Sequence, residues 1–114
     1  MKKSDGPLMD EPSMLNRGAV IVRPKQPYLA WATGLDDSGV VPDVSGEKMI
    51  YLIPSFESDQ QGWEILKKIY DQIFNNELRG WHTDPSAWPQ ERSFVVFQHW
   101  FHVEFHSVVE DLCD

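Results

Sequence analysis

The amino-acid sequence predicts a single α/β layer domain, in which a three-stranded mixed or parallel sheet is packed by one long helix and two or three short ones. Three observations predict this fold class. Two continuous apolar runs each end at a proline, a stretch of about 20 residues repeats its apolar side chains at helical spacing, and the last third of the chain alternates apolar and polar side chains. The 114 residues, 41% of them apolar, suffice for one hydrophobic core, which we expect within residues 19–112.

The first 18 residues predict a disordered tail. They mix Lys, Asp, Glu, Pro, Gly and Ser with scattered Leu and Met, so they offer too little apolar surface to offset the entropy of ordering them. Met14 precedes the first apolar run and is an alternative natural start of the chain. The sequence leaves the choice between Met1 and Met14 open.

A strand and a short helix follow the tail. Ala19–Val22 is an apolar, mainly β-branched run stopped at Pro24, which predicts a strand buried on both faces. Pro27 suits the first turn of a helix of about two turns, and Gly34 has the position of a left-handed C-cap. Residues 36–46 are acidic and rich in turn formers, so we expect an exposed loop there.

Met49–Ile53 is the second apolar run, and its unbroken hydrophobicity predicts a central strand. A long helix is expected over 59–78, with Ser58 as its N-cap, a glutamine three residues later to complete a capping box, and Gly80 as its stop. Gly62 should cost about 1 kcal/mol unless another element packs closely against it. The positions that recur every three or four residues as one stripe are Leu66, Ile69, Tyr70, Ile73, Phe74, Glu77 and Leu78.

Two segments lead from the long helix to the end of the chain. Residues 81–89 predict a compact linker whose two tryptophans close the core. After Pro89 aromatic residues recur at helical spacing and predict a short helix, whereas the competing interpretation is a strand at 93–98 in a hairpin with a strand at 101–109. We favour the helix, because residues 98–100 hold no Gly, Asn, Asp or Pro for the turn that such a hairpin needs.

The last strand is predicted at a sheet edge, with one buried and one polar face. His102, Glu104 and His106 share the polar face, and their side-chain types suit a metal ion. The outer two Cα atoms would lie about 13 Å apart, whereas zinc needs each donor atom within about 2.1 Å. Two of the three would therefore need a further ligand, for which His82 and His99 are candidates. The alternative interpretation is a solvated polar face.

Other chemistry has less support in the sequence. A histidine beside Glu104 also suits acid–base catalysis or a pH switch, since histidine titrates near neutrality. There is no Gly-x-Gly-x-x-Gly, Walker, Gly-x-Ser-x-Gly or Cys-x-x-Cys motif to indicate nucleotide binding, serine hydrolysis or dithiol redox chemistry. A group of aromatic residues could anchor a partner, although core positions are more usual for these residue types. The group comprises Trp81, Trp88, Phe94, Phe97 and Trp100.

The charge of the chain bears on its partners. A formal net charge of −8 at pH 7 repels nucleic-acid phosphates and anionic lipid heads, so we expect neither nucleic-acid nor membrane binding. The same charge favours a basic protein partner, or serves solubility alone. Cys113 is the only cysteine and is next to the last residue, which suggests an exposed thiol in a reducing cytoplasm. The lysines at the N-terminus are not followed by an apolar run, so no signal peptide or transmembrane segment is expected. No cofactor is expected either, since no cofactor-binding motif is present.

Several segments together resemble a family of small acidic proteobacterial proteins, over about residues 14–112 of this chain. The resemblance implies no activity and no catalytic residues. Chains of this kind have been labelled VacJ, an outer-membrane lipid-transport lipoprotein, but that label implies a leader ending at a lipidated cysteine, and the only cysteine here is Cys113. The segments that carry the resemblance are Val20–Tyr28, Tyr51–Pro54, Gly80-Trp81, Trp88-Pro89 and Trp100–His106.

The sequence therefore predicts a non-enzymatic cytoplasmic protein that acts through protein–protein contacts. The absence of a complete catalytic motif and the net acidity support this hypothesis. The alternative is a metal-binding or acid–base enzyme that uses His102, Glu104 and His106.

Overall fold

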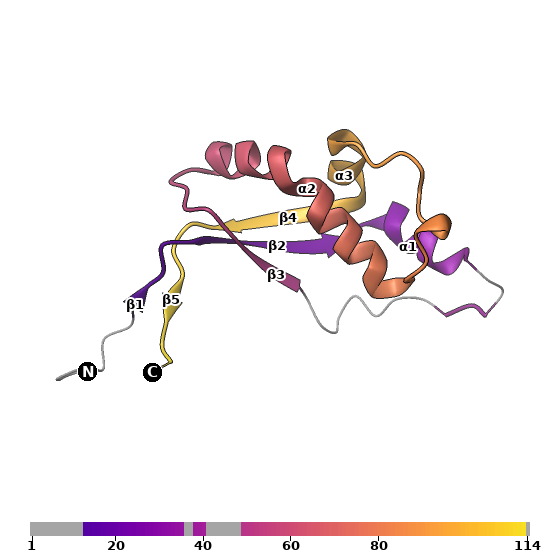
Figure 1. Ribbon diagram of the computed structural model, residues 1–114, viewed down its shortest axis with the longest axis horizontal. Helices are drawn as coiled ribbons and strands as arrows, with labels where there is room; N and C mark the ends of the chain where they lie inside the picture. Colours follow the sequence, from indigo (N-terminus) through magenta and orange to yellow (C-terminus); the bar gives the residue numbers. More distant parts are fainter. Residues whose placement is uncertain (1–12, 36–37, 41–48, 114) are drawn as a thin grey trace.

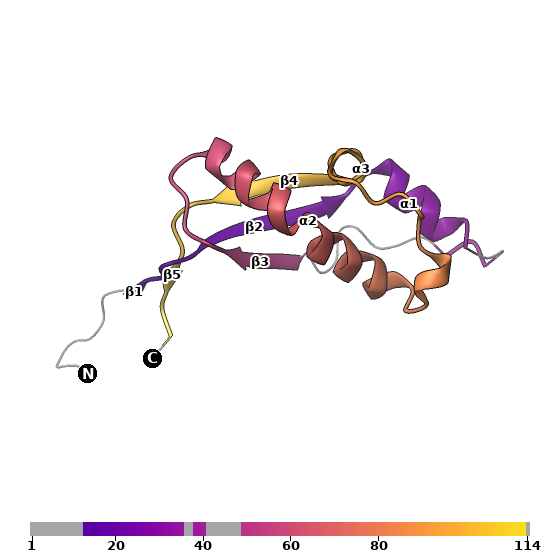
Figure 2. The same cartoon turned by 45° about the horizontal axis from the view of Figure 1, so that its top comes forward.

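The computed structural model describes residues 13–35, 38–40 and 49–113, and within them the chain forms a three-stranded sheet, a two-stranded ribbon and three α-helices (Figure 1). Helices α2 and α3 lie over one face of the sheet, α1 lies beyond the end of β2, and no described helix lies over the other face (Figure 2). The elements in chain order are β1 (Ser13–Met14), β2 (Gly18–Pro24), α1 (Gln26–Thr33), β3 (Met49–Ile53), α2 (Asp59–Trp81), the 3-10 turn η1 (Pro85–Ala87), α3 (Phe94–Trp100), β4 (Phe101–His106) and β5 (Glu110–Asp111).

The three-stranded sheet is antiparallel throughout, with β2 between β3 and β4. The prediction of an α/β domain with one long and several short helices is confirmed, but the mixed or parallel sheet is wrong, and so is the central position predicted for Met49–Ile53. β3 and β4 do run in the same direction, because α2 and α3 carry the chain from the Gly18 end of the sheet back to its Pro24 end. β2 lies between these two strands and is antiparallel to both. The alternation of strands and helices is thus consistent with the helical connection from β3 to β4, but it does not predict that β2 lies between these two strands.

β2 is central because both of its faces are apolar. Val20 and Val22 are buried on the side of the helices, Ala19 is buried on the other side, and Ile21 beside it is partly buried. An unbroken β-branched run is typical of a strand in this position.

α2 begins as its sequence predicts. The Ser58 hydroxyl accepts the backbone N–H of Gln61 at 3.3 Å, and the Gln61 side chain accepts the backbone N–H of Glu57 at 2.7 Å. Gly62 has the close neighbour that its place in a helix requires, since an added Cβ would lie 2.7 Å from the Phe105 ring of β4. The buried residues of α2 are Gly62, Leu66, Ile73, Phe74 and Leu78.

α2 continues through the predicted stop at Gly80 and ends at Trp81. The indole N–H of Trp81 donates to the Ala32 carbonyl of α1 at 3.1 Å, and the backbone N–H of His82 still donates to the Leu78 carbonyl at 2.9 Å. These two bonds extend the last turn of the helix past the glycine, so the predicted end at residue 78 is wrong.

α1 forms where Pro27 predicts it, but its C-cap differs from the prediction. Gly34 has φ −82°, an ordinary right-handed value, and its backbone N–H donates to the Ala30 carbonyl at 3.0 Å. The predicted left-handed cap is therefore wrong, because the last turn closes with a bond that any residue could make.

Residues 94–100 are helical, so the helix favoured from the sequence is confirmed and the hairpin is wrong. The Ser93 hydroxyl caps α3 by accepting the backbone N–H of Val96 at 3.2 Å. β4 begins at the next residue after α3 and lies at a sheet edge, as predicted, although its pairing with β2 ends at His106 rather than at residue 109.

Residues 13–18 differ from the predicted disordered tail. Ser13 and Met14 pair with Asp111 and Glu110, and the backbone N–H of Leu15 donates to the Val109 carbonyl at 2.7 Å. Backbone pairing of this kind does not depend on apolar side chains, so composition did not predict it. Residues 1–12 and most of the loop predicted at 36–46 lie outside the described residues.

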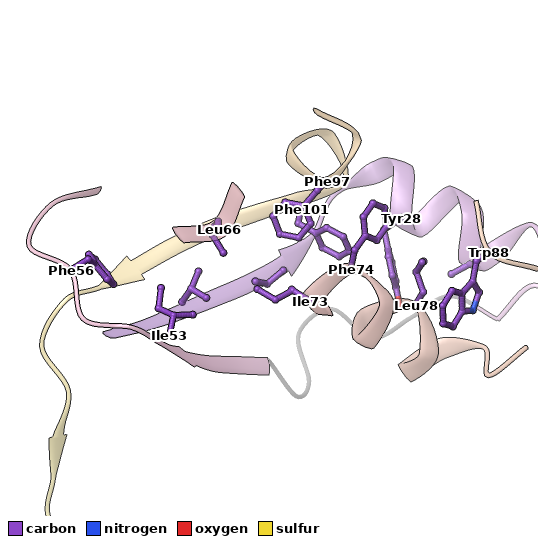
Figure 3. Close-up of a cluster of buried hydrophobic side chains, with 13 residues drawn as sticks. Tyr28, Ile53, Phe56, Leu66, Ile73, Phe74, Leu78, Trp88, Phe97 and Phe101 are labelled. Atoms are coloured by element: carbon purple, nitrogen blue, oxygen red, sulfur yellow. The ribbon is translucent and has the colours of Figure 1, made fainter. Parts of the chain in front are cut away.

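The core lies between the helices and the sheet face beneath them, which we name the covered face (Figure 3). Phe74, Phe97 and Phe101 are almost completely inaccessible to solvent, and Phe101 packs against the other two with ring centroids 5.4 and 5.2 Å apart. This aromatic centre joins α2, α3 and β4. None of the helices described is long and apolar enough to cross a membrane.

Candidate functional site

The candidate site is the side of the sheet that no described helix covers, which we name the open face (Figure 2). Residues paired in antiparallel strands point to the same side, and the pairing places Ile21 between Ile50 of β3 and Glu104 of β4. One side of the open face is therefore apolar and the other is charged. Its residues are Ala19, Ile21 and Arg23 of β2, Ile50 and Leu52 of β3, and His102, Glu104 and His106 of β4.

Glu104 is the centre of the charged side. His106 Nε2 lies 2.6 Å from Glu104 Oε2, and Arg23 Nη2 lies 3.3 Å from Glu104 Oε1. The hydrogen bond from His106 and, next, the positive charge of Arg23 lower the pKa of Glu104 below its ordinary value. Since an ionised carboxylate only accepts hydrogen bonds, His106 Nε2 carries the shared proton. The three side chains form a charged cluster in contact with solvent.

The structure brings only part of the predicted metal site together. His102 shares the open face with the His106–Glu104 pair, whereas His82 caps the end of α2 and His99 is exposed in the last turn of α3. Among the described residues, no three His, Cys, Asp or Glu side chains form a group that could hold a metal ion. The metal site therefore stays a prediction, with one histidine–carboxylate contact in its favour.

The apolar side of the open face is formed by Ile50 and Leu52, each 58% exposed. Ile21 continues this apolar surface onto β2, whereas Met49, which is 48% exposed at the beginning of β3, pairs with Val22 and so belongs to the covered side. Neighbouring exposed side chains of this size are typical of a contact site for another protein.

The sequence predicted the opposite environment for these side chains. An unbroken apolar run usually marks a strand covered on both sides. Among the described strands β3 is instead at the edge, and no described helix covers one of its faces, so its alternate residues Ile50 and Leu52 meet solvent. The apolar sequence of β3 alone does not indicate whether its second face is covered by another part of the same chain or by a partner protein.

A second polar cluster joins α2, β3 and α1 on the covered side. The Tyr51 hydroxyl donates to Glu77 Oε2 and accepts from Asn76 Nδ2 at 2.8 Å, while the Tyr28 hydroxyl donates to the Glu77 backbone carbonyl at 2.8 Å. Burial raises the pKa of Glu77 and of Tyr51, and it raises the pKa of Tyr28 to about 12. The neutral forms of these groups are therefore favoured, and their hydrogen bonds hold the three elements together.

The sequence contains one signal of this cluster, although the cluster was not among the predicted sites. Glu77 occupies a position on the apolar stripe of α2, where an ionisable residue needs a partner inside the protein. A tyrosine within the apolar run of β3 was the available partner.

The aromatic group considered as an anchor belongs to the core instead. Two of its members are buried and the others pack against the core. The indole N–H of Trp88, for example, donates to the His82 carbonyl at 2.8 Å, and Arg79 and Arg92 lie 5.5 and 5.7 Å from its ring centroid. These residues therefore belong to the folded core and do not form an exposed anchor.

Cys113 is exposed, as its position in the sequence predicts. Its backbone N–H donates to Asp111 Oδ1 at 2.8 Å, and no second cysteine exists in the chain to pair with it.

No protein-family model, curated protein or solved structure matches this chain, so the family resemblance inferred from the sequence stays an expectation.

Proposed function

We propose that this protein is a non-enzymatic binding protein that holds a protein partner on its open face. The observation that carries the proposal is the exposure of Ile50 and Leu52, which are 58% accessible on a sheet face that no described helix covers. An apolar centre beside a charged rim, here Arg23, Glu104 and His106, is the usual composition of a protein contact. Burial of the apolar side would supply affinity, and the charged side would orient the partner.

The partner that we propose is a basic protein, met in a reducing cytoplasm. A chain with a net charge of −8 attracts positively charged proteins over distances of several ångströms and repels nucleic acids and anionic lipids. Glu104 offers an ionised carboxylate to an arginine or lysine of the partner. Because exposed charges are screened by salt, the complex should weaken as ionic strength rises.

Affinity capture at native abundance tests the proposal with a matched pair of variants. Leu52→Asp places a charge on the apolar side, and Val95→Asp places the same charge on an equally exposed position of α3 (60% against 58%). We expect a basic protein to be recovered with the wild type and with Val95→Asp, but not with Leu52→Asp. Recovery of no partner from cells rich in the protein, or equal recovery by all three forms, would contradict the proposal.

The 2.6 Å contact between His106 and Glu104 favours a second candidate function, a metal-binding or acid–base enzyme that uses these residues with His102. Metal binding would require a further donor to approach them. Elemental analysis after expression in metal-supplemented medium tests the metal version: it predicts bound metal that is lost in His106→Ala, and protein free of metal would exclude it.

A further inference from the structure

The two outer strands of the sheet differ in their free edges. Within the described part of the chain, β3 pairs only with β2, so the outer edge of Met49–Ile53 has no strand partner. An exposed apolar edge strand presents a row of backbone donors and acceptors to which another strand can bind. β4 also pairs only with β2 among the described strands.

The side chains show which edge is protected. β4 carries the polar side chains of Glu104 and His106, and the ion pair of Glu104 with Arg23 discourages a strand from pairing there. β3 consists of Met, Ile, Tyr, Leu and Ile and holds no charged residue. Among the strands that the structure describes, β3 is therefore the one whose outer edge is open to pairing.

We propose that the edge of β3 pairs with β3 of a second copy of this chain, so that two molecules form one six-stranded antiparallel sheet. The proposal goes beyond the proposed function, because it assigns the backbone edge of β3 rather than the open face, and its occupant is a second acidic copy rather than a basic protein.

The strand can pair with itself in one full register. A two-fold axis through Tyr51 places Tyr51 opposite its copy, Met49 opposite Ile53, and Ile50 opposite Leu52. Opposed residues must point to the same side of the sheet, so a slip of one residue would place Ile50 of the open face opposite Tyr51 of the covered face. The register centred on Tyr51 uses all five residues.

The charges of two copies are compatible with this arrangement. The apolar sides, formed by Ile50 and Leu52, join at the centre of a continuous face, and the charged sides lie at its two rims. With five strand spacings of about 4.8 Å between them, the two β4 strands lie about 24 Å apart, well beyond the Debye length of about 8 Å at physiological salt. The pairing thus opposes no like charges at the interface.

The size of the interface and the net charge set the expected affinity. Five paired residues form a contact about 17 Å long. A single pair of strands of that length buries less surface than a standard interface, which buries about 800 Å² per partner, so the dimer should be weak. Each chain also carries a net charge of −8, and repulsion between copies is screened by salt. Salt should therefore strengthen self-association, whereas it should weaken binding of a basic partner.

Sedimentation of the full chain from about 10 µM to about 1 mM, the range in which a small interface dissociates, tests the proposal at low and high salt. We expect a monomer–dimer equilibrium that shifts toward the dimer with salt. Ile50→Lys and Met49→Lys place a charge at the edge and should weaken the dimer about 10-fold or more. Val95→Lys adds the same charge on α3 and should leave dimerisation intact, and circular dichroism verifies that each variant is folded.

Hydrogen exchange locates the interface. Backbone amides of β3 should become more protected as the concentration of the wild type rises, and those of β4 should not. A monomer at every concentration and salt, equal dimerisation of Ile50→Lys and Val95→Lys, a dimer without added protection of β3, or growth beyond two copies would each overturn the proposal.

The outcomes also separate this proposal from the proposed function. A monomer that still captures a basic partner through Leu52 removes the dimer and keeps the proposed function. A salt-strengthened dimer whose partner capture is unaffected by Leu52→Asp keeps the dimer and removes the basic-partner proposal.

Discussion

The covered and open faces of the sheet are formed by alternate residues of the same three strands, but their side chains differ in exposure to solvent. On the covered face, Val20 and Phe101 are buried beneath the helices; on the open face, Ile50 and Leu52 are each more than half exposed. Apolar side chains are present on both faces, so hydrophobicity alone does not decide which residues form the core. The position of the helices decides it, and folding leaves one apolar surface uncovered among the described residues.

Each face also has a glutamate, and the surroundings of the two glutamates shift their pKa values in opposite directions. Glu77 of α2 lies among buried groups on the covered side, and burial raises its pKa. Glu104 of β4 lies on the open face, where the hydrogen bond from His106 lowers its pKa. The difference shows that desolvation dominates on the covered side and charge-assisted hydrogen bonding dominates on the open side.

Truncation of a large side chain should separate the two faces most strongly. Phe101→Ala removes a ring from the aromatic centre and should cost about 3–5 kcal/mol of unfolding free energy. Leu52→Ala removes an exposed side chain and should change stability by no more than about 0.5 kcal/mol. Urea denaturation of both variants checks this, and equal losses would mean that the open face is covered in solution.

Two glycines of α2 sharpen the comparison, because alanine normally stabilises a helix by about 1 kcal/mol relative to glycine. At Gly80 an added Cβ meets nothing within 4 Å, so Gly80→Ala should stabilise by up to that amount. At Gly62 the Cβ would meet the Phe105 ring at 2.7 Å, so Gly62→Ala should destabilise, by on the order of 1 kcal/mol net.

Thermal or urea denaturation of the two alanine variants gives the sign of each effect. Gly62→Ala combined with Phe105→Leu is the control, since the smaller side chain should relieve the contact. Stabilisation by Gly62→Ala alone would show that β4 and α2 pack more loosely than the covered face indicates.

The sequence predicted local elements better than their arrangement. The capping of α2 by Ser58, the helix at 94–100 and the packing against Gly62 follow from interactions between neighbours in the sequence or from a single steric requirement. The insertion of β2 between β3 and β4 depends on long-range pairing, which leaves no periodic pattern.

The candidate site was predictable only on its charged side. Alternation placed His102, Glu104 and His106 on one face correctly, because the period of a strand fixes that relation. Arg23 could not be added, since its contact with Glu104 follows from the pairing of β2 with β4. The apolar side was missed because exposed and buried apolar runs are alike in sequence.

The Glu77→Gln variant tests the partly buried carboxyl of the covered side. Because the folded-state pKa of Glu77 is raised, the folded protein loses stability as pH rises from the unfolded-state pKa through the folded-state pKa. Glutamine remains neutral and can still accept the Tyr51 hydroxyl, so Glu77→Gln should gain stability relative to the wild type toward neutral pH. Below the unfolded-state pKa the two should differ little.

Urea denaturation at several values from about pH 4 to about pH 8 measures that difference. Glu64→Gln makes the same change of charge at an exposed position of the same helix and serves as the control. A stability difference between Glu77→Gln and the wild type that stays constant with pH would show that Glu77 is solvated. The two glutamates would then no longer differ in the direction of their pKa shifts.

The smallest effect is expected at Glu104 on the open face. Its lowered pKa means that the ionised carboxylate stabilises the fold above the unfolded-state pKa, and that this contribution is lost as pH falls through the folded-state pKa. Solvent screens the cluster, since the Glu104 side chain is 38% exposed, so the change in stability should be slight and an NMR titration of the carboxyl is the better measurement. His106→Ala should raise the pKa of Glu104 more than Arg23→Ala does, because the hydrogen bond from His106 is the larger cause. If Arg23→Ala gave the larger rise, the ion pair with Arg23 rather than the hydrogen bond from His106 would be the main cause of the lowered pKa of Glu104, and added salt would then raise that pKa in the wild type as well.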